Sequence, residues 1–218
     1  MKMMQNLGMN DLGFSRRLTQ FLIRSRLAVV ATLLLPATAM SQVDPAWLKS
    51  WRQAVDERPK VLTSRTRIVS DDEAGEPLVV LGHIVSPDGS NAAGVVVQMY
   101  QRDAEGLEFG AGDHSTTTWR LQGWAKTDPS GQFIFDTIRP APDHLGREAA
   151  HLHFTLVSEK YGHQWAPKIF FADGSLVTSD QRRRSKKRGV FGQVVPVDRS
   201  QAQPSIKVNF QLKPSPDF

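Results

Sequence analysis

Two histidines, His151 and His153, are the residues of this sequence whose type and spacing most directly suggest chemistry. In an extended strand the side chains alternate, so both imidazoles point to one face while Leu152 and Phe154 point to the other. Imidazole is a common metal ligand, and two on one face can reach a single ion. The pattern therefore predicts a metal site that other segments complete. The alternative is an exposed pair of histidines on an edge strand.

Short segments rich in β-branched and aromatic residues surround the histidine pair along the chain, separated by turn residues. They recur about every ten residues and show almost no helical periodicity, which is typical of an all-β sandwich. We therefore predict a β-sandwich of short mixed or antiparallel strands. The expected strands cover 78–85, 95–100, 119–124, 132–135, 151–157, 168–171, 194–197 and 206–210.

One short helix is predicted before these strands, at 44–57. Asp44 supplies a side-chain acceptor at the N-cap, and Pro45 occupies the first helical position. Two tryptophans, a leucine and a valine then follow at helical spacing, and Arg58-Pro59 ends the pattern. We expect this helix to pack on the outside of the sandwich through its tryptophans.

The first 41 residues resemble an export signal, with a basic region, the apolar run 27–40 and a small-residue end. Arg16-Arg17 resembles the pair of a twin-arginine leader, while ordinary secretion in an unfolded state stays open. The apolar run is short for a bilayer span, so an uncleaved anchor is the weaker alternative. We expect an exported protein, periplasmic or secreted, without stable membrane insertion after the signal is removed.

The expected organisation is an export signal at 1–41, an N-terminal helix and lead-in at 42–76, the sandwich at 77–213 and a tail at 214–218. Residues 60–76 of the lead-in are expected to be irregular, residues 110–118 to form a polar loop, and His163 to lie in a loop. The whole chain holds 27 Lys and Arg against 22 Asp and Glu. Five basic residues and one acidic residue lie in the leader, which leaves 22 against 21 and a net charge of +1. This balance predicts no nucleic-acid partner. No pattern indicates an oligomeric state.

Two further features of composition limit the possible sites. The basic cluster at 182–188 is interpreted as a solvated loop, with a polyanion site as the alternative. The chain contains no cysteine, which excludes disulfides, thiolate metal ligands and thiol nucleophiles.

Several motifs before and at the histidine pair occur in a recognisable order. They are Gly123-Trp124, the run from Thr127 through Phe133-x-Phe135 to Pro140, and His151-Leu152-His153-Phe154. This order resembles the intradiol ring-cleavage dioxygenases, the family of catechol and protocatechuate dioxygenases, over most of 77–200. The resemblance implies a β-sandwich that holds one non-haem ferric ion and opens the ring of a small catechol-type aromatic with dioxygen. It assigns the family's two histidine ligands to His151 and His153.

The two tyrosine ligands of that family have no counterpart at the matching positions, which are occupied by Glu108 and Asp143. The resemblance, with these replacements, implies a metal set of His151, His153, Glu108 and Asp143. Such a set suits Fe(II), Mn(II) or Zn(II) better than the Fe(III) of the family, because phenolate is the donor that favours ferric iron. The alternative is a degenerate site in which both acids face solvent.

The family's arginine, three residues before the first histidine, is also displaced. Glu148 stands at that position, and the neighbouring Arg147 is the candidate catalytic arginine. The glutamine expected before the next strand is Lys168. Three functions stay open: an exported intradiol dioxygenase, a non-catalytic metal- or ligand-binding sandwich, and a different divalent-metal enzyme.

Overall fold

The computed structural model describes residues 43–109 and 118–218. The predicted export signal at 1–41, and most of a polar loop expected at 110–118, lie outside the described residues. No helix in the described part of the chain is long and apolar enough to cross a membrane.

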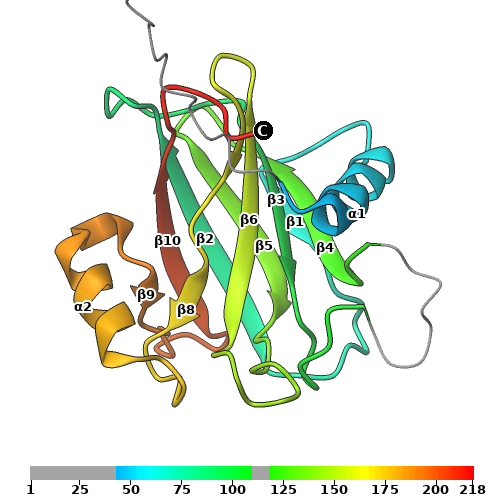
Figure 1. Cartoon of the computed structure of the whole chain (residues 1–218), viewed down its shortest axis with the longest axis vertical. Coiled ribbons are helices and arrows are strands. Elements are labelled where there is room, and N and C mark those ends of the chain that lie inside the picture. Colours follow the sequence, from blue (N-terminus) through cyan, green and yellow to red (C-terminus); the bar gives the residue numbers. More distant parts are fainter. Residues whose placement is uncertain (1–42, 110–117) are drawn as a thin grey trace, which may run out of the picture. The chain divides into compact units, whose positions relative to one another are not determined.

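The regular elements of the described chain are mostly strands, which form two sheets around a shared core (Figure 1). In chain order the elements are α1 (Pro45–Asp56), β1 (Arg65–Arg67), β2 (Pro77–Val85), β3 (Val96–Gln101), β4 (Leu121–Lys126), β5 (Gln132–Ile138), β6 (His151–Ser158), β7 (Gly162–Trp165), β8 (Ile169–Phe171), α2 (Ser179–Lys187), the 3-10 helix η1 (Gly189–Phe191), β9 (Val194–Val195) and β10 (Ser205–Gln211).

The smaller sheet has the strand order β1-β5-β2-β10, and the larger sheet has the order β4-β3-β6-β8-β9, with β7 also paired to β6. The pairs β1–β5, β2–β10 and β8–β9 are parallel, and the other pairs are antiparallel. The predicted all-β sandwich with mixed strands is therefore confirmed.

Strand β6 carries the histidine pair, and its two faces differ as the alternation predicts. Leu152 and Phe154 are almost fully buried in the core between the sheets. Each contributes about 1.5–3 kcal/mol by leaving water. His151 and His153 lie on the opposite face of the larger sheet. The apolar face of β6 thus anchors the strand, and this anchoring fixes the direction of both imidazoles.

Helix α1 forms where it was predicted, and it packs beside β3 and β4 on the larger sheet (Figure 1). The Asp44 side chain accepts a hydrogen bond from the backbone N–H of Ala46 at 2.9 Å, as expected of an N-cap. Trp51 is buried in an aromatic cluster with Tyr100 and Trp119. The helix therefore covers part of the sheet next to the histidine pair.

The interpretation of the basic cluster at 182–188 as a loop is wrong, because most of it forms helix α2. Thr178 and Gln181 make a reciprocal capping box at its start. Asp180 in the first turn forms ion pairs with Arg183 and Arg184. Arg184, Lys186 and Lys187 lie in the last turn, where the helix dipole favours positive charge.

Two other local predictions also need correction. The lead-in at 60–76, expected to be irregular, contains β1, which pairs with β5. His163, expected in a loop, lies in β7 opposite Val157 of β6. Both strands are short, and their pairing with long neighbouring strands compensates for a weak local pattern.

Candidate metal centre

The two histidines of β6 approach each other closely, with 2.7 Å between their Nε2 atoms. Nδ1 of His151 lies 2.7 Å from the backbone oxygen of Ala149, which can only accept a hydrogen bond. Nδ1 therefore carries the proton, and Nε2 of neutral His151 presents a lone pair. It follows that Nε2 of His153 is the donor in the bond between the two rings.

The distance between the two Nε2 atoms is close to the distance between two nitrogen ligands of one metal ion. Nitrogens bound at about 2.0–2.1 Å and at right angles lie about 3 Å apart. The pair can therefore accept a common ion with a small opening of the two rings. His153 would also need to move its proton from Nε2 to Nδ1, because a ligating nitrogen must be unprotonated.

Burial keeps both imidazoles neutral. It lowers the pKa of His151, and it lowers the pKa of His153 to about 2, with further repulsion from His151, Lys168 and Arg102. Neutral imidazole is the form that binds metals. The pair is therefore in the correct charge state for metal binding at neutral pH.

Glu148 supplies the carboxylate nearest to the pair, with Oε1 at 3.9 Å from Nε2 of His151. Lys168 donates to Oε1 at 2.5 Å, and Arg102 donates to Oε2 at 3.0 Å. Burial raises the pKa of Glu148, but the hydrogen bonds from Lys168 and Arg102 outweigh it and lower the pKa to about 2. Glu148 is therefore ionised and held by two cations.

Tyr100 lies beside the pair but is not arranged as a metal ligand. It is registered opposite His153 on β3, and the two rings stack with centroids 4.5 Å apart. Its hydroxyl accepts a hydrogen bond from Nε1 of Trp47 in α1 at 2.9 Å. Burial raises the pKa of Tyr100, so the phenol stays protonated.

These residues do not fit the ferric centre with two phenolates that the resemblance implies. Tyr100 is a buried phenol, and Tyr161, the other tyrosine of the sequence, packs against the core cluster between the sheets. The donors near the pair are instead imidazole and carboxylate, which suit divalent ions.

Glu108 and Asp143 border a different space, a pocket of about 340 Å³ between two loops. The loops approach each other at Gly106, where a Cβ would lie 2.2 Å from the backbone oxygen of Pro142. Gly106 also has φ +84°, which L-residues with a side chain rarely adopt. The pocket is lined by Arg102, Gly106, Leu107, Glu108, Phe109, Asp143 and His144.

Both acids of this pocket already have partners. Oε1 of Glu108 lies 3.2 Å from Nη2 of Arg102. Oδ1 of Asp143 accepts the backbone N–H groups of Arg147, at 2.6 Å, and of Glu148. The bond to Glu148 is the largest cause of the lowered pKa of Asp143. Asp143 thus stabilises the turn that leads to Glu148.

In residues 43–109 and 118–218, no three His, Asp or Glu side chains gather closely enough to hold a metal ion. The structure brings the two histidines together, but it does not assemble the predicted set that adds Glu108 and Asp143. Arg147 is exposed, and its backbone rather than its side chain contacts Asp143. Metal binding and the catalytic role of Arg147 stay predictions.

Sequence reasoning missed Arg102, whose guanidinium joins the pocket to the histidine pair through Glu108 and Glu148. It directly follows Gln101, which is registered opposite Leu152, so it continues β3 toward His151. Alternation places it on the same face as Tyr100. This signal becomes visible only when β3 is known to pair with β6.

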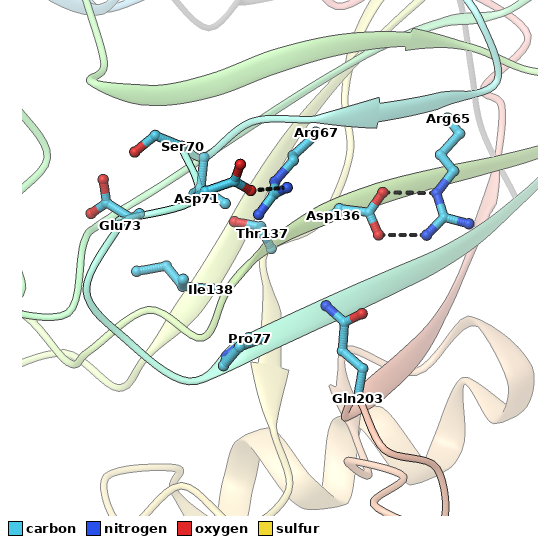
Figure 2. A pocket seen from close by; sticks show the side chains of 11 residues that line it. Arg65, Arg67, Ser70, Asp71, Glu73, Pro77, Asp136, Thr137, Ile138 and Gln203 are labelled. Atoms are coloured by element: carbon cyan, nitrogen blue, oxygen red, sulfur yellow. Dashed lines mark hydrogen bonds and ion pairs between the residues drawn. The ribbon is translucent and has the colours of Figure 1, made fainter.

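A second pocket, of about 320 Å³, lies at β1 and β5 of the smaller sheet (Figure 2). Arg65 donates two hydrogen bonds of 2.7 Å to the carboxylate of Asp136, and Arg67 pairs with Asp71. Its lining includes no histidine. With its arginines paired and largely open to solvent, it is a weaker candidate than the histidine face.

Comparison with known proteins supports the fold and the family. The family model described as Dioxygenase matches residues 56–214, most of the chain. Catechol 1,2-dioxygenase 1 of Acinetobacter lwoffii is 29% identical over 126 residues, which cover 56% of this chain and 37% of that protein. The 6-chlorohydroxyquinol 1,2-dioxygenase of Cupriavidus pinatubonensis is 32% identical over 117 residues, 43% of this chain and 39% of that protein. The matches thus span well under half the length of these relatives.

Solved structures show the same fold. The 3-chlorocatechol 1,2-dioxygenase of Rhodococcus opacus superimposes with a TM-score of 0.55 at 23% identity, covering 71% of this chain and 66% of that one. The dioxygenase domain of a carbohydrate-binding fusion protein from a Streptomyces species gives a TM-score of 0.52 at 20% identity, covering 71% and 91%. With the family match over 56–214 and the His-x-His strand in place, this chain belongs to the intradiol ring-cleavage dioxygenase family.

Proposed function

We propose that this protein is a metal-dependent dioxygenase of small catechol-type aromatics that uses a divalent ion, foremost Fe(II), at His151 and His153. The observation that carries the proposal is the convergence of two neutral imidazole nitrogens, 2.7 Å apart, on the sandwich of this family. The absence of tyrosine at both family ligand positions favours a divalent ion over a ferric one.

The surrounding residues have distinct roles in this proposal. His151 and His153 provide the nitrogen ligands, and Glu148 is the nearest carboxylate that could join them. When bound, the ion would supply Lewis-acid and redox chemistry for a catechol and dioxygen. Lys168 and Arg102 carry positive charge beside this point, which favours the loss of a proton from a bound catechol.

The pocket at Arg102, which Arg102 and Glu148 connect to the histidine pair, has the size and lining for a single aromatic ring. Its volume of about 340 Å³ lies in the range of small-molecule sites. Leu107 and Phe109 provide apolar surface, while Glu108 can accept a hydrogen bond from a catechol hydroxyl.

The test is anaerobic reconstitution of metal-free protein with Fe(II), Mn(II), Zn(II) or Fe(III), followed by oxygen uptake with catechol. We expect one Fe(II) per chain, oxygen consumption with Fe(II), a ring-opened product, and none of the burgundy colour of ferric phenolate. Protein that retains no divalent ion, or that retains Fe(II) and consumes no oxygen with any catechol tested, would contradict the proposal.

A second function, ligand binding without catalysis, is favoured by one observation. Arg102 and Lys168 already neutralise Glu148, so the charge balance near the histidines does not require a metal. Catechol binding to the metal-free protein, without oxygen uptake in any metal form, would support this function instead.

We further propose that the chain is exported and that its leader is removed between about residues 40 and 42, where the cleavage rule places the small-residue end. The support is the basic-then-apolar pattern of the first 41 residues. Mass spectrometry of the protein recovered outside the cytoplasm tests it, and an intact N-terminus would contradict it.

A further inference from the structure

We infer that Arg102 is an internal cation that holds the carboxylates of Glu108 and Glu148 together in the absence of metal. It competes with a metal ion for these carboxylates. The inference rests on the proposed metal site at His151 and His153. It goes beyond that proposal by assigning the control of metal affinity to a residue outside the ligand set.

The first support is the position of the guanidinium. Nη2 of Arg102 lies 3.2 Å from Oε1 of Glu108 and 3.0 Å from Oε2 of Glu148. These acids come from two separate loops, one before β4 and one before β6. The Arg102 side chain is only 14% exposed, so solvent screens the interaction weakly. One buried cation thus joins the carboxylate of the pocket to the carboxylate beside His151.

The second support is that this arrangement is incomplete. Nη1 of Arg102 is buried and has no hydrogen-bond partner in the described part of the chain. A buried donor without an acceptor costs about 1–3 kcal/mol. The guanidinium is therefore held by its charge rather than by full hydrogen bonding, which lowers the cost of displacing it.

The third support is the electrostatic repulsion between the Arg102 guanidinium and a metal cation at the histidine pair. Arginine keeps its charge at all accessible pH values, so the repulsion it exerts on another cation cannot be relieved by deprotonation. A carboxylate that forms an ion pair with Arg102 is also less available to bind a metal ion. Displacement of the guanidinium would leave Glu148 paired with the half-exposed Lys168 alone, so that this carboxylate, 3.9 Å from His151, could complete a set of two histidines and one carboxylate.

Lys168 is a weaker candidate for the same role. It contacts Glu148 but not Glu108, and its side chain is 42% exposed. An exposed ammonium can move into water at little cost. Arg102 is buried and is bound to both acids, so its removal has the larger effect on the site.

The experiment measures Zn(II) affinity of the full chain by competition with a chromophoric chelator, in wild type and in Arg102→Gln. We expect affinity to rise at least 10-fold in Arg102→Gln, because both acids lose their shared buried cation and a fixed positive charge is removed. Adding His153→Ala to Arg102→Gln should abolish the gain. Metal-free Arg102→Gln should unfold at a lower temperature than wild type, and Zn(II) should raise its unfolding temperature more than that of wild type.

Arg120→Gln is the matched control. The Arg120 side chain also joins two acids, Glu73 and Asp103. Its link to the candidate site is a backbone hydrogen bond to the carbonyl oxygen of Glu108 at 3.0 Å, which the substitution keeps. Its replacement should change Zn(II) affinity by less than about twofold, as expected for a charge with no ligand partner. An equal gain in Arg120→Gln would show a general charge effect and would overturn the inference.

Other outcomes separate the inference from the proposed function. Unchanged or weaker Zn(II) binding in Arg102→Gln overturns the role of Arg102, even where wild type binds metal. A 10-fold gain with no oxygen uptake by any Fe(II) form supports the inference and contradicts the proposed function. Should Arg102→Gln fail to fold, Arg102→Lys keeps a charge but loses the bridge between acids. Arg102→Lys should show a smaller gain in Zn(II) affinity than expected for Arg102→Gln. No gain in Arg102→Lys would again overturn the inference.

Discussion

Two charged regions of this protein use the same residue types with different results. In the pocket of Figure 2, Arg65 is 60% exposed and binds the two oxygens of Asp136 in a one-to-one pair. At the candidate centre, Arg102 is 14% exposed, is shared by two acids and has one nitrogen, Nη1, with no partner among the described residues.

The difference is a matter of desolvation. Water screens the first pair and satisfies its remaining donors, so the pair perturbs its neighbours little. At the second region water is largely excluded. Burial is the main cause of the lowered pKa of both histidines, and the charges of Lys168 and Arg102 add to it. Burial raises the pKa of Glu148, but the hydrogen bonds from Lys168 and Arg102 outweigh it and lower this pKa. Burial, rather than the number of charged residues, therefore distinguishes the candidate site from a polar surface hollow.

The largest expected effect is on metal affinity, and it distinguishes His153 at the candidate centre from His83 on the other sheet. His153→Ala should weaken divalent-metal binding by about 100-fold or more, because it removes a direct ligand, and loss of a supporting residue already costs 10–100-fold. His83 lies on the other sheet and bonds Asn91 at 2.9 Å. His83→Ala should leave metal affinity unchanged. Equal affinities of the two variants, by titration, would place the metal elsewhere.

The next largest effect is on the free energy of unfolding, when a carboxylate is changed to an amide in each of the two regions. Glu148→Gln leaves the buried Arg102 with Glu108 as its remaining acid, and we expect a loss of about 1–3 kcal/mol in the free energy of unfolding. Asp136→Asn leaves an exposed arginine, and we expect a loss below about 1 kcal/mol. Urea unfolding of metal-free protein measures both. A larger loss in Asp136→Asn would reverse the comparison.

A smaller effect is expected from Tyr100→Phe. The change removes the acceptor for Nε1 of Trp47 and keeps the ring that stacks on His153. Stability should fall by about 1 kcal/mol, the typical value of one hydrogen bond. Metal affinity and the visible spectrum should stay as in wild type. Loss of a visible absorption band on this change would show that Tyr100 binds the metal as a phenolate.

The smallest effect is the pH dependence of stability that arises from the partly exposed ion pair of Arg139 and Asp173. A hydrogen bond from Arg139 lowers the pKa of Asp173 from 3.8 to about 2, against a smaller opposing effect of burial. The folded carboxyl is thus ionised where the unfolded one is protonated, so its stabilisation is present above pH 4 and is lost toward pH 2.

Asp173→Asn should therefore be less stable than wild type at pH 5, by less than about 1 kcal/mol because the pair is partly exposed. The difference should vanish near pH 2. Unfolding curves at both pH values measure it, and a difference that persists at pH 2 would contradict the assigned pKa.

Local patterns in the sequence were sufficient for much of the architecture. Alternation along 151–157 predicted which residues of β6 enter the core, because a strand has only two faces. The Asp44-Pro45 pair predicted the start of α1, because capping depends on adjacent residues. Helix α2 was missed because its sequence is almost entirely polar, and its stability comes from a capping box, local ion pairs and the helix dipole.

The sequence by itself determined that two imidazoles share one face and that both family tyrosines are replaced by acids. Only the tertiary structure decided which acid approaches the pair. Glu148 lies near His151 because Asp143 holds the intervening turn, while Glu108 and Glu148 meet at Arg102 because β3 pairs with β6. These contacts join segments far apart in the chain, and their strength depends on burial. Neither property can be read from residue types and spacing, because both arise when the two sheets and their loops exclude water together.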